Sequence, residues 1–261
     1  MARANKNKEA AIGSQNRTVS PNEAKSALTH CIKLQRPIMM WGAPGIGKSD
    51  IVKQIADQEG REVIDIRLPL WEPTDIKGIP YYNSKENNMV WASPAELPTD
   101  PKSNAIVFLD ELNSAAPAVQ AAAYQLILNR RVGQYHLPEG VSIVAAGNRD
   151  SDKGVTYRMP APLANRFVHV ELRVDFEDWM EWATNQHIHA DVVGYCTFAK
   201  QDLYDFDPRG SSRSFATPRS WSFVSQLLSD DLPESTLTDL VAGCVGEGLA
   251  VKFMNHRKIS G

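Results

Sequence analysis

The chain has 261 residues, of which 43% are hydrophobic and 23% are charged, and its formal net charge is −3. This length suffices for one large folding unit or a large and a small one, and the composition is ordinary for a globular protein. The slightly acidic balance, without a basic and aromatic stripe, argues against a nucleic-acid partner. We find no signal peptide and no apolar run of about eighteen residues, so no membrane segment is expected.

The three cysteines, Cys31, Cys196 and Cys244, lie far apart in the sequence. They include no CxxC pair, which argues against a zinc site and against a disulfide framework. Thiols of this kind fit a reducing setting, and we therefore expect a cytoplasmic location.

The first 18 residues are polar, small and mildly basic, and they predict a flexible N-terminal arm over residues 1–18. Ser20 followed by Pro21 then predicts the start of a helix, with Ser20 as its N-cap. We expect this helix to run to about Leu34.

From Pro37 onward, short apolar runs alternate with helix-forming stretches such as the Ala-rich residues 115–129. Continuous apolar strands separated by helices are typical of a parallel sheet covered on both faces. Residues 19–173 are therefore predicted to form an α/β domain, a three-layer αβα core with a parallel five-stranded sheet. Its strands are expected at residues 37–41, 62–68, 105–109, 141–147 and 167–172.

The strand pattern stops after about Val174. The remaining chain is predicted to form a small all-helical lid domain over residues 174–261. Its helices are expected at residues 175–200, 218–229 and 233–256.

The segment GAPGIGKS follows the first predicted strand and opens a helix, and it fits the pattern G-x-x-x-x-G-K-[ST]. Glycines in such a loop allow backbone N–H groups to surround phosphate oxygens, and the helix N-terminus adds partial positive charge. Lys48 is expected to reach the β- and γ-phosphates and Ser49 to ligate magnesium. The predicted nucleotide-binding residues are Gly42, Ala43, Pro44, Gly45, Ile46, Gly47, Lys48, Ser49 and Asp50.

A second motif is the apolar run AIVFL, which leads directly into Asp110 and Glu111. The carboxyl end of this predicted strand lies on the same sheet edge as the glycine-rich loop. Asp110 is therefore expected to bind the nucleotide through magnesium, and Glu111 to act as general base toward the attacking water. A dinucleotide-binding G-x-G-x-x-G loop is absent from this position, which favours phosphoryl chemistry over hydride transfer.

Five stretches of the chain resemble the MoxR family of AAA+ ATPases, over roughly residues 20 to 256. They are DIKGIP, LDELNSAAPAVQAAAYQLILNRRVG, AAGNRD, LANRF and ATPRSW. The family usually has Ile where this chain has Leu112, a minor departure. The resemblance implies a hexameric, ATP- and Mg²⁺-dependent ring that remodels or activates a protein partner, often a separate von Willebrand factor A-type chain. It also implies that Asn148 is a sensor amide, Arg166 an arginine finger for the neighbouring subunit, and Arg219 a second sensor of the γ-phosphate.

Two insertions are predicted to form hairpins. In residues 76–98, aromatic and apolar residues flank a polar turn, which suits either a loop facing a central pore or an ordinary surface hairpin. In residues 130–140, Arg130 and Arg131 could either contact the nucleotide of a neighbouring subunit or lie on an ordinary solvent-exposed surface. His187 and His189 are two residues apart, so on a helix they do not share a face, and no metal site is expected there.

Three functions remain open at this point. The chain is an enzyme in a remodelling ring, or a binding module whose assembly ATP switches, or an ATPase subunit of a nucleic-acid-processing system. The combination of Glu111, Asn148, Arg166 and Arg219 favours the enzyme, because a switch does not require all four.

Overall fold

The computed structural model describes residues 17–149, 152 and 156–260. The predicted arm, residues 1–18, therefore lies outside the described residues except for its last two positions. Among the helices that the structure describes, none is long and apolar enough to cross a membrane.

The core is a parallel sheet with strand order β1-β10-β2-β9-β6-β3. Five of its strands are those predicted from the sequence, with bounds β2 (Ile38–Trp41), β3 (Val63–Arg67), β6 (Ile106–Asp110), β9 (Ser142–Gly147) and β10 (Val168–Leu172). A sixth strand, β1 (Thr18–Val19), pairs with β10 in the register Thr18↔Glu171. The prediction of five strands was therefore one short, because a two-residue edge strand carries no recognisable hydrophobic pattern.

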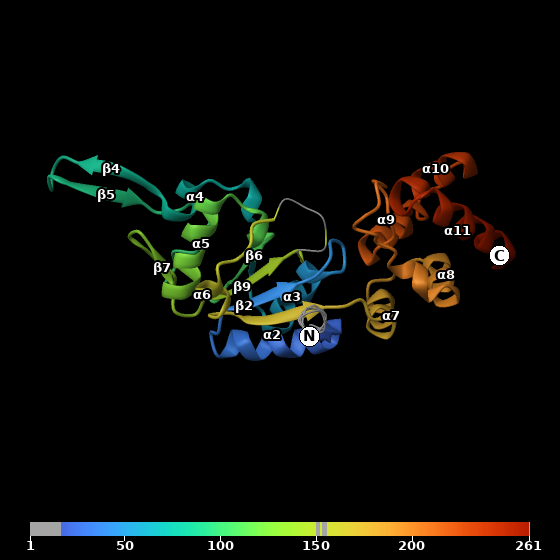
Figure 1. Ribbon diagram of the computed structural model, residues 1–261, viewed down its shortest axis with the longest axis horizontal. Helices are drawn as coiled ribbons and strands as arrows, with labels where there is room; N and C mark the ends of the chain where they lie inside the picture. The colour runs from blue at the N-terminus through green and yellow to red at the C-terminus, as the bar shows by residue number, and fades with distance from the viewer. Residues whose placement is uncertain (1–16, 150–151, 153–155, 261) are drawn as a thin grey trace, which may run out of the picture.

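Helices cover both faces of the sheet, as the continuous apolar strands predict. Alternate residues of one strand enter different hydrophobic clusters. Ile106 and Phe108 pack with residues of α2 (Pro21–Lys33) and α3 (Lys48–Glu59), whereas Val107 and Leu109 pack with residues of α5 (Pro117–Asn129). Figure 1 shows α2 and α5 on opposite sides of the sheet. The predicted three-layer αβα core is therefore present.

Short elements connect these layers. The 3-10 helices are η1 (Leu68–Leu70) and η2 (Leu112–Ser114), and the short α-helices are α4 (Pro73–Lys77) and α6 (Ala161–Ala164). The first predicted insertion forms the hairpin of β4 (Ile79–Asn83) and β5 (Asn88–Ala92), which projects away from the sheet in Figure 1. The second forms the small hairpin of β7 (Arg131–Val132) and β8 (Tyr135–His136).

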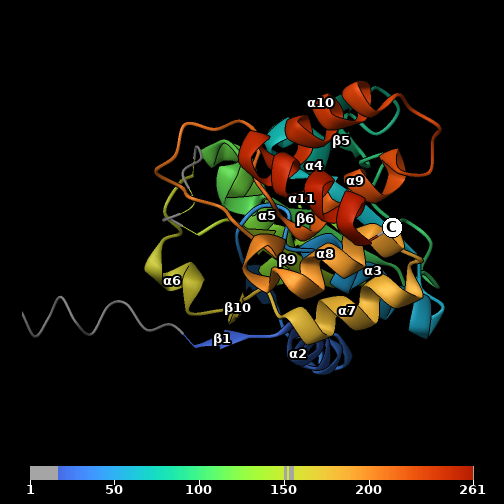
Figure 2. The same ribbon diagram turned by 90° about the vertical axis from the view of Figure 1, so that its right-hand side faces the viewer.

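The C-terminal part is helical and has a hydrophobic cluster of its own, centred on Tyr195, Trp221 and Phe253. Two predicted helices are each divided in two. A backbone turn with positive φ at His187 separates α7 from α8, and Gly246 separates α10 from α11. Figure 2 views these helices in front of the sheet; they are α7 (Phe176–Asn185), α8 (Ala190–Phe198), η4 (Lys200–Leu203), α9 (Pro218–Leu227), α10 (Glu234–Val245) and α11 (Glu247–Ser260).

The predicted N-cap of the first helix is confirmed. The Ser20 hydroxyl accepts a hydrogen bond from the Glu23 N–H, and the Glu23 carboxylate accepts one from the Ser20 N–H, each at 3.2 Å. This reciprocal pair satisfies two backbone donors that the helix itself leaves without partners.

Replacing Ser20 by alanine should lower the free energy of unfolding by about 1 kcal/mol, because the Glu23 N–H loses its acceptor. Urea unfolding measures the change. The matched control is Ser26→Ala, an exposed position inside the same helix, which should leave stability unchanged or slightly raised. Equal losses in the two variants would contradict the capping role.

Candidate nucleotide-binding site

The glycine-rich loop joins β2 to α3 at the carboxyl edge of the sheet. Gly45 and Gly47 have φ angles of 79° and 98°, in the left-handed region that side chains other than glycine rarely adopt. A Cβ on Gly45 would also lie 2.7 Å from Oγ1 of Thr217. Ala43 and Ile46 are buried, so the loop is anchored to the core while its backbone stays close to the helix N-terminus.

Lys48 is the buried cation of this site, with 9% of its surface exposed. Its ammonium donates to the carbonyl oxygens of Gly42 and Ala43, and to Oδ1 of Asn148 at 3.1 Å. Burial lowers the pKa of Lys48 to about 8, while the negative charge of nearby Asp110 opposes that shift. The buried ammonium therefore loses its proton more easily than an exposed lysine does, although the negative charges of Asp110, Asp152 and Glu111 nearby favour its charged form.

The two predicted carboxylates follow one another at the end of β6. Oδ1 of Asp110 accepts the backbone N–H of Glu111 at 2.9 Å, which holds the Asp110 side chain at the turn. Glu111 has a φ of 55° and turns the chain from the strand into η2. Both carboxylates are near enough to Lys48 to raise its pKa by their charge. The structure therefore brings these three predicted residues together.

Asn148 follows β9, the strand between β2 and β6. Because its Oδ1 accepts from Lys48, its amide nitrogen is directed elsewhere and remains a donor for a ligand. Its backbone carbonyl accepts from the side-chain amide of Asn113 at 2.9 Å. Sequence reasoning did not single out Asn113, although it stands two residues after Glu111.

The start of α9 lies directly against the glycine-rich loop. The backbone N–H of Arg219 donates to the carbonyl of Gly45 at 3.2 Å, and Thr217 packs against the same glycine. Thr217 is also the N-cap of α9 and forms a capping box with Ser220. The local sequence Thr-Pro-Arg-Ser carries the capping signal, but the contact with Gly45 depends on the fold.

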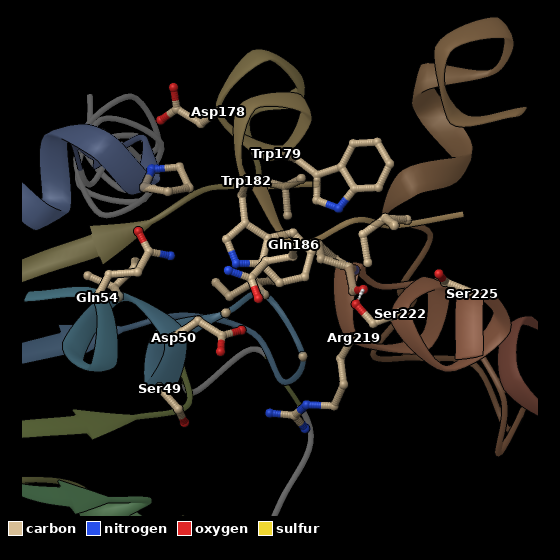
Figure 3. Close-up of a pocket in the computed structure, with 18 of the residues that line it drawn as sticks. Ser49, Asp50, Gln54, Asp178, Trp179, Trp182, Gln186, Arg219, Ser222 and Ser225 are labelled. Carbon is tan, nitrogen blue, oxygen red and sulfur yellow. Dashed lines mark hydrogen bonds between the residues drawn. The ribbon is translucent and has the colours of Figure 1, made fainter. Parts of the chain in front are cut away.

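A cavity of about 930 Å³ lies between the glycine-rich loop and the C-terminal helices. In Figure 3 the side chains of Asp50 and Arg219 both point into it, with Ser49 at the start of α3. The opposite wall comes from α7 and its C-terminal cap and includes Trp182 and Gln186. The sequence did not indicate these two residues, because they lie far along the chain from the loop. The cavity has room for a nucleotide beside the predicted phosphate loop.

Arg166 is the one predicted catalytic residue that lies apart from this group. It precedes β10, whose first residue Val168 pairs with Ile38 at the start of β2, whereas the glycine-rich loop follows the end of β2. Because Arg166 precedes β10, it lies at the opposite edge of the sheet from its own loop, and its side chain is exposed. Nearby, His169 accepts from Nε1 of Trp41 at 2.9 Å and, through its other ring nitrogen, donates to the Ala164 carbonyl at 2.6 Å.

Other candidate residues have local partners. Arg130 donates to the carbonyls of Pro138 and Val141 at 2.7 and 2.8 Å, so it braces the second hairpin and is not a freely solvated residue. His189 caps α8, and His187 lies in the turn before it, so the single helix assumed for them was wrong. Within the described ranges, no group of three or more His, Cys, Asp or Glu side chains is arranged to hold a metal ion.

Comparisons with known proteins agree with this arrangement. The model of the ATPase family associated with various cellular activities (AAA) matches residues 37–169. Midasin from Giardia intestinalis is 28% identical over 186 residues, which are 67% of this chain and 4% of that protein. Midasin from Dictyostelium discoideum is 25% identical over 167 residues, 58% of this chain and 3% of the relative. The chain thus spans only a small part of the length of these relatives.

Among solved structures, NtrX from Brucella abortus matches with a TM-score of 0.50 at 15% identity, covering 87% of this chain and 54% of that one. RuvB from Thermotoga maritima matches with a TM-score of 0.49 at 17% identity, covering 90% and 68%. At this identity the likeness to NtrX concerns the fold alone. The family match includes the glycine-rich loop, both carboxylates and Asn148, and it covers more than half of the chain. The chain therefore belongs to the ATPase family associated with various cellular activities.

Proposed function

We propose that this chain is an ATP-hydrolysing ring ATPase of the MoxR type, which remodels or activates a partner protein. The observation that carries the proposal is the buried Lys48 ammonium, which is bonded to Asn148 and lies near Asp110 and Glu111 beside a nucleotide-sized cavity. In this proposal, residues 19–173 form the ATPase core and residues 174–261 the lid.

The loop from Gly42 to Ser49 holds the phosphates through its backbone N–H groups and through Lys48. The Ser49 hydroxyl and the Asp110 carboxylate are hard oxygen donors, which suit Mg²⁺. This donor set needs no all-protein cage, because Mg²⁺ is usually held by one or two protein ligands together with phosphates and waters. When bound, Mg²⁺ neutralises phosphate charge.

The remaining residues are assigned to the reaction itself. Glu111 takes a proton from the attacking water, which is the role of a general base. The Asn148 amide nitrogen donates to that water or to the γ-phosphate, since its oxygen is held by Lys48. Arg219 approaches the γ-phosphate from the lid, supported by the bond between its backbone and Gly45.

Arg166 is proposed to act on the nucleotide of a neighbouring subunit. Its exposure, and its place at the opposite edge of the sheet from its own loop, support action between subunits over action within one chain. We therefore propose a homo-oligomeric ring, a hexamer by resemblance to the MoxR family.

The partner of the ring is proposed to be a protein, such as a separate von Willebrand factor A-type chain. The β4–β5 hairpin projects from the core with Tyr81, Tyr82 and Met89 exposed, which supports contact with a polypeptide. The free thiols of the three cysteines support a cytoplasmic location.

ATP binding should draw a proton onto Lys48. Because the pKa of the buried ammonium is about 8, the side chain is about half charged at pH 8, and the phosphates favour the charged form. Calorimetry in buffers of different ionisation enthalpy should therefore find uptake of about half a proton per ATP at pH 8, and little uptake below about pH 7.

The matched control is Lys48→Arg, in which the side chain stays charged, so that any retained binding should proceed without this uptake. Lys48→Ala should bind no measurable ATP. Wild-type affinity in the alanine variant would show that this loop does not hold the phosphates.

Replacing Glu111 by glutamine should leave binding of ATP with Mg²⁺ intact and lower kcat by about 10²- to 10⁴-fold, because the amide cannot take a proton from water. Steady-state phosphate release and equilibrium binding measure the two effects. Glu62→Gln, an exposed carboxylate just before β3, is the control and should be unaffected. Normal turnover in Glu111→Gln would place the base elsewhere.

Replacing Arg166 by alanine should lower kcat by about 10³- to 10⁵-fold with little change in ATP affinity, because a finger acts on transition-state charge. Wild-type specific activity should rise steeply with protein concentration. Mixing Arg166→Ala with Lys48→Ala subunits should restore part of the turnover, since some interfaces then combine two intact halves.

The control for this variant is Arg131→Ala, which removes another exposed arginine of the core. If Arg131→Ala alone lost turnover, the finger would be assigned to the second hairpin. Concentration-independent activity without rescue on mixing would mean that each chain works alone.

A further inference from the structure

Asn113 is a buried residue that lies against the end of β9, close to the proposed catalytic residues Glu111 and Asn148. It is 1% exposed and belongs to η2, the short turn that follows Glu111. Its side-chain Nδ2 donates to the carbonyl of Asn148 at 2.9 Å, and its own carbonyl accepts from the N–H of Tyr157 at 2.7 Å. Asn113 therefore bonds both to Asn148 and to Tyr157.

Packing makes this connection stiff. A Cβ on Gly147 would lie 2.5 Å from Oδ1 of Asn113 and 2.6 Å from Cε of Met39, so the end of β9 lies directly against the Asn113 amide. Leu112, the preceding residue, is completely buried, and the N–H of Ser114 bonds to the carbonyl of Glu111 at 2.9 Å. The turn after Glu111 thus has little freedom to move relative to the core.

The side-chain amide of Asn113 donates a hydrogen bond but does not accept one from the described residues. A carbonyl accepts and does not donate, so the group that faces Asn148 must be the NH₂ group. The buried Oδ1 of Asn113 has no hydrogen-bond partner within the described part of the chain. A buried acceptor without a partner lowers stability, so a residue chosen for stability alone would not carry it.

We propose that Asn113 is a positioning residue for ATP hydrolysis, which sets the distance between Glu111 and Asn148. This inference rests on the proposed function, in which Glu111 accepts the proton and Asn148 orients the water or the γ-phosphate. Asn113 is joined to Glu111 through the rigid turn and to Asn148 through its side-chain bond. In the proposed function, ATP binding depends on the loop from Gly42 to Ser49, whereas the hydrogen bonds of Asn113 go to Asn148 and Tyr157.

The test compares two variants of Asn113 with a matched pair at Gln120. Gln120 is a buried amide on α5 that is 4% exposed, and its Nε2 donates to the Ala115 carbonyl at 2.9 Å. Asn113→Asp keeps the shape and removes the donor, and Asn113→Ala removes the amide without burying a charge. Gln120→Glu and Gln120→Ala are the corresponding controls, and all four variants are expected to lower Tm.

Only the Asn113 variants should lower kcat, by about 10- to 100-fold, because a misplaced reacting group slows the chemical step. The Kd for ATP with Mg²⁺ should change by less than about twofold. If the aspartate variant does not fold, the alanine variant gives the same comparison. Equal losses of kcat in the Asn113 and Gln120 variants, or unchanged kcat in the Asn113 variants, would overturn the inference.

A double-mutant cycle identifies the residue through which Asn113 acts. In the Asn148→Ala background, Asn113→Ala should lower kcat little further, because the group that it positions is already absent. A full additional loss would overturn the inference about Asn113 and leave the proposed function intact. Normal turnover in Asn148→Ala alone would instead contradict the proposed role of Asn148, and the inference about Asn113 with it.

Discussion

The site is organised around a single buried cation. The Lys48 ammonium is removed from water, and its direct partners are neutral oxygens of Gly42, Ala43 and Asn148. Neutral oxygens compensate for lost hydration only partly, which is why burial lowers the pKa of the side chain. An anion with several negative charges is the ligand that such a centre favours, and the surrounding backbone N–H groups of the loop favour the same ligand.

The same centre connects segments that are distant in sequence. Lys48 belongs to the helix after β2, Asn148 follows β9, and Asp110 ends β6, and these three strands are adjacent in the sheet. Because parallel strands present their carboxyl ends at one edge, each strand contributes one chemical group there. The bond from Asn113 to Asn148 then ties two of these ends to each other beneath the site.

The C-terminal helices line the cavity on the side away from the sheet and contact the glycine-rich loop. Thr217 contacts Gly45, and the backbone N–H of Arg219 donates to the carbonyl of the same residue. A movement of the loop would therefore also displace the start of α9. The wall contributed by Trp182 and Gln186 lies on the other side of the cavity. In contrast, Arg166 is exposed at the opposite edge of the sheet, which supports the proposal that it acts on the nucleotide of a neighbouring subunit.

The sequence by itself determined the alternation of strands and helices, the glycine-rich loop and the pair Asp110-Glu111, because these are local patterns of spacing and hydrophobicity. It left out β1, whose two residues form a strand only because β10 offers a free edge. The helical pattern also predicted one continuous helix, whereas the backbone turns at His187 and divides it into α7 and α8. Only the tertiary structure decided that Asn113 meets Asn148 and that Thr217 meets Gly45, since each contact joins residues whose separation along the chain carries no signal.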